Sequence, residues 1–254
     1  MFRRLAAVVG AVFSAGCAPP APAEQVGVAP RPEVLSGAFT EGFVGQAEND
    51  RYPVRVIRIG AVAIPSGRVI VADPFLLSMR DQPLTVAVPP GRYPVDLAVA
   101  DTGSGGHRVA LARLQISDEP VARWTMAVVA GQDVATLKAD ETFGYGVDAG
   151  TGAFIDAGLP AWLEQRYPPD QVDFYEAVSE GWQTRGEALG PELGIPYGFV
   201  LIEEYEGRGA AMFSSGCGDG FYTTWVGHDA SGRPAALVTD FGVIEAVTLP
   251  PPGR

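Results

Sequence analysis

Cysteine, basic residues and charge of either sign are all scarce in this chain. Two Cys among 254 residues are too few for a disulfide framework or, on their own, for a four-ligand zinc site. The chain has 18 basic and 30 acidic side chains, so its net charge is −12. This charge argues against sequence-independent binding to DNA or RNA. Only 19% of the residues are charged and 47% are hydrophobic, so the composition predicts a folded chain with a sizeable core.

The chain opens with a hydrophobic run that is too short to cross a membrane as a helix. Arg3 and Arg4 precede an almost wholly apolar stretch from Leu5 to Ala15. That stretch is about half of the ~20 residues that a membrane-spanning helix needs. A positive start, a short apolar core and small residues after it are typical of an export signal.

The first of the two cysteines stands directly after this segment. Ser14-Ala15-Gly16-Cys17 resembles the bacterial lipobox, in which a diacylglycerol is attached to the Cys and cleavage leaves that Cys first. The usual pattern has Leu three residues before the Cys, where this chain has Ser14. We predict a lipoprotein signal peptide at 1–16 and lipidation at Cys17. Ordinary cleavage after Ala23 stays open as an alternative.

A proline- and alanine-rich segment follows the predicted anchor. Five of the fifteen residues from Ala18 to Pro32 are Pro, which favours extended polyproline II conformation. We therefore predict a tether at 17–35 that joins the anchor to a folded domain and contributes nothing to the core. A disordered tail left by cleavage is the alternative interpretation.

The remainder is typical of a mainly β (α+β) protein. Short β-rich runs between Gly and Pro predict a single domain at 36–249, a β-sandwich or distorted barrel-like domain, with 250–254 as a tail. Two hairpins are predicted early in it, and a third closes through Asp229–Arg233. The early hairpins pair Val54–Ile64 with Val69–Ala72, and Leu84–Val88 with Tyr93–Ala100.

Helical signals are confined to one insert near residues 160–189. Pro160 is suited to begin a short turn, and Asp170 is suited to cap a second helix. Near-helical spacing predicts one buried stripe that covers a sheet face. That stripe consists of Val172, Tyr175, Val178 and Trp182.

Five phrases, most of them with Gly or Pro residues, stand in order along the chain. They are Ile64–Arg68 with Ala72–Pro74, Val88–Val95, Phe143–Gly152, Phe213–Gly220 and Leu237–Phe241. Together these phrases resemble the bacterial domain-of-unknown-function family 4241. The resemblance spans about residues 59–245 and implies one domain, and it supplies no activity, cofactor or partner.

One of these phrases is similar to a nucleotide-binding loop. Gly146–Gly152 looks like the phosphate loop of sugar kinases and actin-like ATPases. Too few residues follow it for the rest of that fold, and no Gly-Lys-Ser/Thr loop supports nucleotide binding elsewhere. The competing interpretation is a Gly-rich hairpin turn whose Asp side chain bonds to its own backbone.

Two sets of side chains are candidates for chemistry. Cys217, His228 and Asp240 are the nearest approach to a nucleophile, base and orienting acceptor, although a solvent-facing His is the simpler interpretation. Oxygen ligands suit calcium or magnesium, although Asp beside Gly more often forms turns. The candidate metal ligands are Asp148, Asp156, Asp219 and Asp240.

These observations predict a cell-envelope protein held at a membrane by an N-terminal lipid. Its expected role is that of a non-catalytic binding or interaction module without a cofactor. The ligand is an unidentified protein, glycan or small molecule, and nucleic acid is not expected. The alternative is a small hydrolase that uses the Cys217–His228–Asp240 set or a metal held by the Asp cluster.

Overall fold

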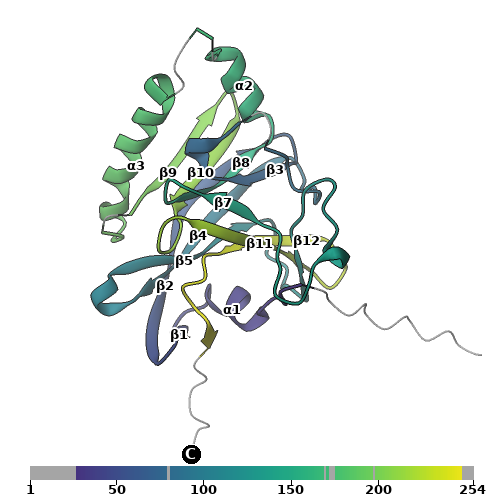
Figure 1. The fold of residues 1–254 in the computed structure, drawn as a ribbon, viewed down its shortest axis with the longest axis vertical. Coiled ribbons are helices and arrows are strands. Elements are labelled where there is room, and N and C mark those ends of the chain that lie inside the picture. Colours follow the sequence, from purple (N-terminus) through teal and green to yellow (C-terminus); the bar gives the residue numbers. More distant parts are fainter. Residues whose placement is uncertain (1–26, 79–80, 169, 172–174, 197, 248–254) are drawn as a thin grey trace, which may run out of the picture.

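The computed structural model describes residues 27–78, 81–168, 170–171, 175–196 and 198–247. The predicted signal peptide, Cys17 and the first part of the predicted tether lie outside the described residues. Two antiparallel sheets, one of nine strands and one of four, form the body of the molecule (Figure 1). The prediction of a mainly β, sandwich-like or barrel-like fold is confirmed.

The nine-stranded sheet contains the longest strands. A bulge at Gly60 allows β2 to bend while it continues to pair with β4. β7 (Tyr145–Val147) lies off the main path and pairs with the start of β11. The main order is β13 (Ala246–Val247), β1 (Val44–Ala47), β2 (Asp50–Ile64), β4 (Gly91–Asp101), β5 (His107–Gln115), β12 (Pro234–Asp240), β11 (Gly220–His228) and β6 (Arg123–Met126).

The four-stranded sheet packs against the first sheet and closes the core. Its order is β3 (Val69–Ala72), β8 (Thr151–Asp156), β10 (Arg208–Ser214) and β9 (Val200–Tyr205). Phe154 and Phe213 project from it, with ring centroids 5.3 Å apart, into one cluster with buried leucines of β4 and β5. Gly209 lets β10 approach β2, because a Cβ there would lie 2.7 Å from the backbone of Ala63.

The helices occupy opposite ends of the molecule. α2 (Leu159–Arg166) and α3 (Glu180–Glu192) cover the outer face of the small sheet, whereas α1 (Pro32–Gly37) lies at the far end (Figure 1). A π-helical turn, Tyr175–Ser179, precedes α3. Short 3-10 turns occur at Pro74–Leu76, Gly103–Gly105 and Val134–Thr136.

The predicted buried stripe does cover a sheet face. Trp182 and Val178 pack with Leu163 of α2 against small-sheet side chains such as Ile155 and Met212. The other two positions predicted for the stripe, Val172 and the side chain of Tyr175, lie outside the described residues. No helix in the described part of the chain is long and apolar enough to cross a membrane.

Two of the three predicted hairpins are not formed. The segments Val54–Ile64 and Val69–Ala72 are strands, but they belong to different sheets. Leu84–Val88 makes only isolated bridges, to Val129 and Arg68, and does not pair with the following strand. The Gly- and Pro-rich sequences therefore predicted where the chain turns, but they did not predict which strands pair with each other. The turn at Asp229–Arg233 does join two paired strands, β11 and β12.

The folded domain begins before Ser36, within the segment predicted to be tether. Pro32 stands in the first turn of α1, where its fixed φ and missing N–H are tolerated. Val34 and Leu35 are 0% and 1% exposed, so this helix belongs to the core. Arg31 also pairs with Asp240, at 2.5 Å between Nη2 and Oδ2.

Candidate functional site

The structure does not assemble a triad from Cys217, His228 and Asp240. Cys217 is exposed in the loop before β11, whereas His228 is the last residue of that strand. Nine extended residues place the ends of β11 about 27 Å apart. Asp240 stands opposite Thr223, about 17 Å from His228 along the strand. The three side chains therefore cannot exchange a proton directly.

His228 is held by its surroundings. Its Nε2 lies 2.8 Å from the Thr125 hydroxyl, and its Nδ1 lies 3.2 Å from the carbonyl oxygen of Gly232. Burial lowers the pKa of His228 below that of a free imidazole, and the bond to Gly232 only partly offsets this effect. Both ring nitrogens have partners within the domain, and the side chain remains partly exposed to solvent.

The four candidate metal ligands are dispersed. Asp156 accepts hydrogen bonds from the backbone and hydroxyl of Ser66. Asp219 accepts one from the N–H of Gly150, and Asp240 is paired with Arg31. Among the described residues no three His, Cys, Asp or Glu side chains are grouped as a metal ion requires. Most of these carboxylates stabilise turns.

The loop similar to a phosphate-binding loop is a crossing between the two sheets. Tyr145–Val147 pairs within the large sheet and Thr151–Asp156 within the small one, so the predicted hairpin is not formed. The buried carboxylate of Asp73 accepts the N–H groups of Asp148 and Ala149, at 3.0 and 2.7 Å. The turn is thus held by another segment rather than by its own Asp side chain.

Segments from three of the phrases singled out in the sequence meet at this crossing. Asp73 binds one side of the 148–150 loop, and Asp219 binds the N–H of Gly150 on the other. The N–H of Ser215 donates to the carbonyl oxygen of Gly150, and β10 pairs with β8 beside it. Below, this network is called the junction. Its hydrogen bonds join the two sheets.

A family model described as a protein of unknown function, DUF4241, matches residues 62–239. The chain belongs to this family. The match covers well over half of the chain and includes every junction residue named above. No curated protein and no solved structure matches the chain. The DUF4241 match thus gives the family of the chain and supplies no activity.

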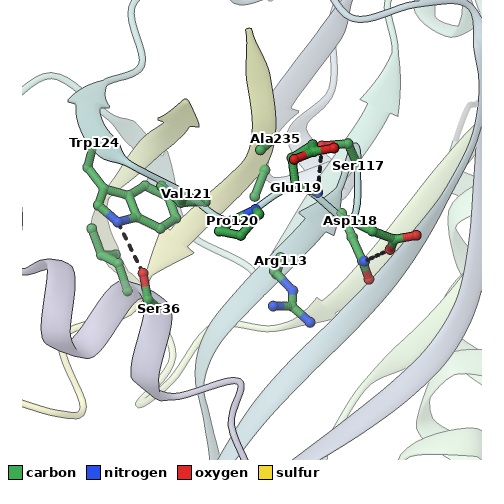
Figure 2. A pocket seen from close by; sticks show the side chains of 12 residues that line it. Ser36, Arg113, Ser117, Asp118, Glu119, Pro120, Val121, Trp124 and Ala235 are labelled. Atoms are coloured by element: carbon green, nitrogen blue, oxygen red, sulfur yellow. Dashed lines mark hydrogen bonds between the residues drawn. The ribbon is translucent and has the colours of Figure 1, made fainter. Parts of the chain in front are cut away.

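A groove with a volume of about 390 Å³ lies beside α1 and does not overlap the junction. Figure 2 shows its walls: α1 on one side, the loop from Ser117 to Val121 above, and the end of β5 below. Trp124 donates from its Nε1 to the hydroxyl of Ser36 at 3.3 Å, which ties α1 to β6. The groove is therefore lined by α1, by the strands β5, β6 and β12, and by one loop.

The loop between β5 and β6 is anchored at both ends. The N–H groups of Ile116 and Ser117 both donate to the carbonyl oxygen of Ala235 in β12. At the other end the N–H of Ala122 donates to the carbonyl oxygen of His228, at 2.7 Å. These bonds fix the groove wall without a ligand, as preformed small-molecule sites require.

A network of charged side chains leads into the groove. Asp96 is 2% exposed and pairs with both Arg58, at 2.8 Å, and Arg113, at 2.6 Å. Burial by itself would raise the pKa of Asp96, but hydrogen bonds from Arg58 and Arg113 outweigh it and lower the pKa. Gln115 extends the network by accepting from Arg58 and donating to Asp118. Asp96 therefore stays ionised and orients Arg113.

Arg113 retains donors that the protein does not use. Only its Nη2 bonds to Asp96, and its Nε is buried with no acceptor among the described residues. Its guanidinium lies 4.3 Å from the ring centroid of Phe39. Stacking on the ring fixes the plane of the guanidinium.

Sequence analysis did not select Asp96, Arg113 or Asp73, although two of the three carried a signal. Asp96 and Arg113 interrupt otherwise apolar strand segments, Tyr93–Ala100 and Val109–Leu114. A buried charge requires a partner of opposite sign, so these two charged residues in apolar strands could have been predicted to form an ion pair. For Asp73, only the spatial meeting of distant loops shows its role.

Proposed function

We propose that this member of the DUF4241 family is a non-catalytic binding module of the cell envelope, held at a membrane by a lipid on Cys17. The binding role is supported by a contrast between polar side chains that bond to the chain itself and polar side chains that keep unused hydrogen-bonding groups. Asp73, Asp156 and Asp219 accept hydrogen bonds from the chain itself. In the groove beside α1, the Nη1 of Arg113 has no acceptor within the described part of the chain.

The sequence at the start of the chain supports the anchor. Arg3 and Arg4, the short apolar run and Gly16-Cys17 follow the pattern of exported lipoproteins. A single acyl chain gives only marginal membrane binding, whereas two or more give stable attachment. Diacylglycerol on Cys17 therefore suffices to hold the domain at a bilayer.

Mass spectrometry of the mature N-terminus tests the anchor. The expected product begins at Cys17 and carries the mass of a diacylglycerol on its sulfur. The variant Cys17→Ala should lose that mass and leave the membrane fraction. Its matched control, Cys217→Ala, should keep both properties, because this second cysteine lies in an exposed loop of the domain.

Two results would contradict the anchor. One is an unmodified chain that starts at Glu24. The other is an intact product, Met1 included, in the soluble interior of the cell.

A further inference from the structure

The groove beside α1 contains a basic and an acidic side chain with unused hydrogen-bonding capacity. Arg113 is already paired with Asp96 through Nη2, but its Nη1 bonds to no acceptor among the described residues. The exposed carboxylate of Glu119 makes no ion pair within the described part of the chain, although its backbone N–H bonds to Ser117. Asp118 differs from Glu119, because it already accepts from Gln115. The Nη1 of Arg113 and the carboxylate of Glu119 are thus available to a ligand.

Another part of the groove wall is apolar. Trp124, Val121 and Pro120 face the groove in Figure 2, and Leu35 of α1 and Ala235 of β12 complete the lining. Trp124 is 7% exposed and held by Ser36, so it offers a surface that does not have to be ordered on binding. Burial of apolar ligand surface there contributes about 25 cal/mol per Å².

The volume indicates the size class of the occupant. The groove is open to solvent, so a bound molecule does not have to fit wholly inside it. A volume of about 390 Å³ lies near the lower end of ligand pockets in general, which suits a small molecule such as a free amino acid.

We propose that the groove binds a small zwitterion with an apolar body, the chemistry of a free apolar amino acid. Arg113 binds its carboxylate, Glu119 binds its ammonium group, and Trp124 and Val121 contact its side chain. This assignment rests on the proposed binding role and gives it a ligand class. It does not depend on the lipid at Cys17, so the two proposals fail in different experiments.

Charge favours a zwitterion over a simple anion or cation. The chain carries a net charge of −12, which repels an anion at long range, whereas a zwitterion has no net charge. A guanidinium offers parallel N–H donors that match the two oxygens of a carboxylate. A cation would satisfy Glu119 but leave the donors of Arg113 unpaired.

Calorimetric titration of the full chain with L-phenylalanine tests the proposal. Two relatives of this probe isolate its charges: N-acetyl-L-phenylalanine lacks the ammonium group, and L-phenylalaninamide lacks the carboxylate. We expect each to bind at least fivefold more weakly than L-phenylalanine. Equal affinity for all three probes, or no heat with any of them, would overturn the proposal.

Two variants assign each charge to its residue. Arg113→Lys should weaken the binding of L-phenylalanine about tenfold and leave the affinity for L-phenylalaninamide unchanged. Glu119→Gln should weaken the binding of L-phenylalanine about fivefold and leave the affinity for N-acetyl-L-phenylalanine unchanged. Matched controls are Arg92→Lys and Glu41→Gln, both outside the groove lining, which should bind all three probes as the unmodified chain does.

The Glu119 variant keeps the test decisive if the Arg113 variant is unstable. Glu119 is exposed and supports no other side chain in the described structure, so its replacement should leave unfolding unchanged. If Glu119→Gln binds L-phenylalanine as tightly as the unmodified chain, the ammonium assignment is wrong and the zwitterion proposal fails.

Discussion

The junction and the groove beside α1 are both rich in polar side chains, yet they use them in opposite ways. At the junction, carboxylates such as Asp73 and Asp219 accept hydrogen bonds from backbone N–H groups of a distant loop. At the groove, Asp96 orients Arg113, whose Nη1 and Nε have no acceptor among the residues that the structure describes. A polar cluster with a structural role therefore differs from one that can bind a ligand in its hydrogen-bond partners, more than in the types of residue it contains.

The largest expected effect comes from breaking the junction. Asp73→Ala should lower the free energy of unfolding by about 3 kcal/mol, because it leaves the N–H groups of Phe75, Asp148 and Ala149 without their acceptor. Urea denaturation measures this loss. The control Asp148→Ala should change stability by less than about 0.5 kcal/mol, since that side chain is exposed. Equal losses in the two variants would show that the junction is not held through Asp73.

Breaking the network behind the groove should have a smaller effect. Asp96→Asn should lower the free energy of unfolding by about 2 kcal/mol, because two arginines lose a charged acceptor while remaining partly solvated.

The pH dependence of that variant sharpens the comparison. Because the pKa of Asp96 is lower in the folded than in the unfolded state, its stabilisation is present above pH 3.8 and lost as pH falls through the folded value. Asp96→Asn should therefore lose less stability than the unmodified chain between neutral pH and pH 3. Parallel pH curves for the two proteins would contradict this account.

A weaker effect is expected at His228. Its pKa is lower in the folded state, so the unfolded state binds the proton first and stability falls as pH drops below 6.5. His228→Gln should remove a small part of this loss between pH 7 and pH 5, because the ring is partly exposed and solvent screens its charge. Thermal unfolding at the two pH values measures it. If the stability of the variant depends more steeply on pH than that of the unmodified chain, this account of His228 is wrong.

The smallest effect is expected at Cys217. Its thiol is exposed and belongs to no triad, so Cys217→Ser should change stability by less than about 0.5 kcal/mol. Binding of L-phenylalanine should be the same in both proteins. A loss of binding in the serine variant would mean that the loop at 217 contributes to the ligand site.

Local patterns predicted local structure well. The strands at Val54–Ile64 and Val69–Ala72 follow from β-rich runs, and the buried stripe through Val178 and Trp182 follows from helical spacing. Both signals are set by neighbours in the chain. Strand pairing was predicted less well, because Val69 and Ile64 are close in sequence but join different sheets. Pairing depends on the whole sheet, which a turn sequence does not specify.

The candidate site could be predicted only in part. Asp148, Asp156 and Asp219 attracted attention by their glycine neighbours, yet the distances between them and their backbone partners exist only in three dimensions. The groove is made by α1, the end of β5 and the 117–121 loop, which are far apart in the sequence. The proline content led to the prediction of a tether where the structure has the start of α1. Pro32 begins that helix rather than preventing it.

The comparison of the two regions is tested most directly by mapping the amide signals of the full chain by nuclear magnetic resonance during titration with L-phenylalanine. The account predicts that the signals that move belong to Arg113, the 117–121 loop and Trp124, while those of Asp148–Gly150 and Cys217–Asp219 stay in place. Movement confined to Asp148–Gly150 and Cys217–Asp219, or no movement at all, would contradict it.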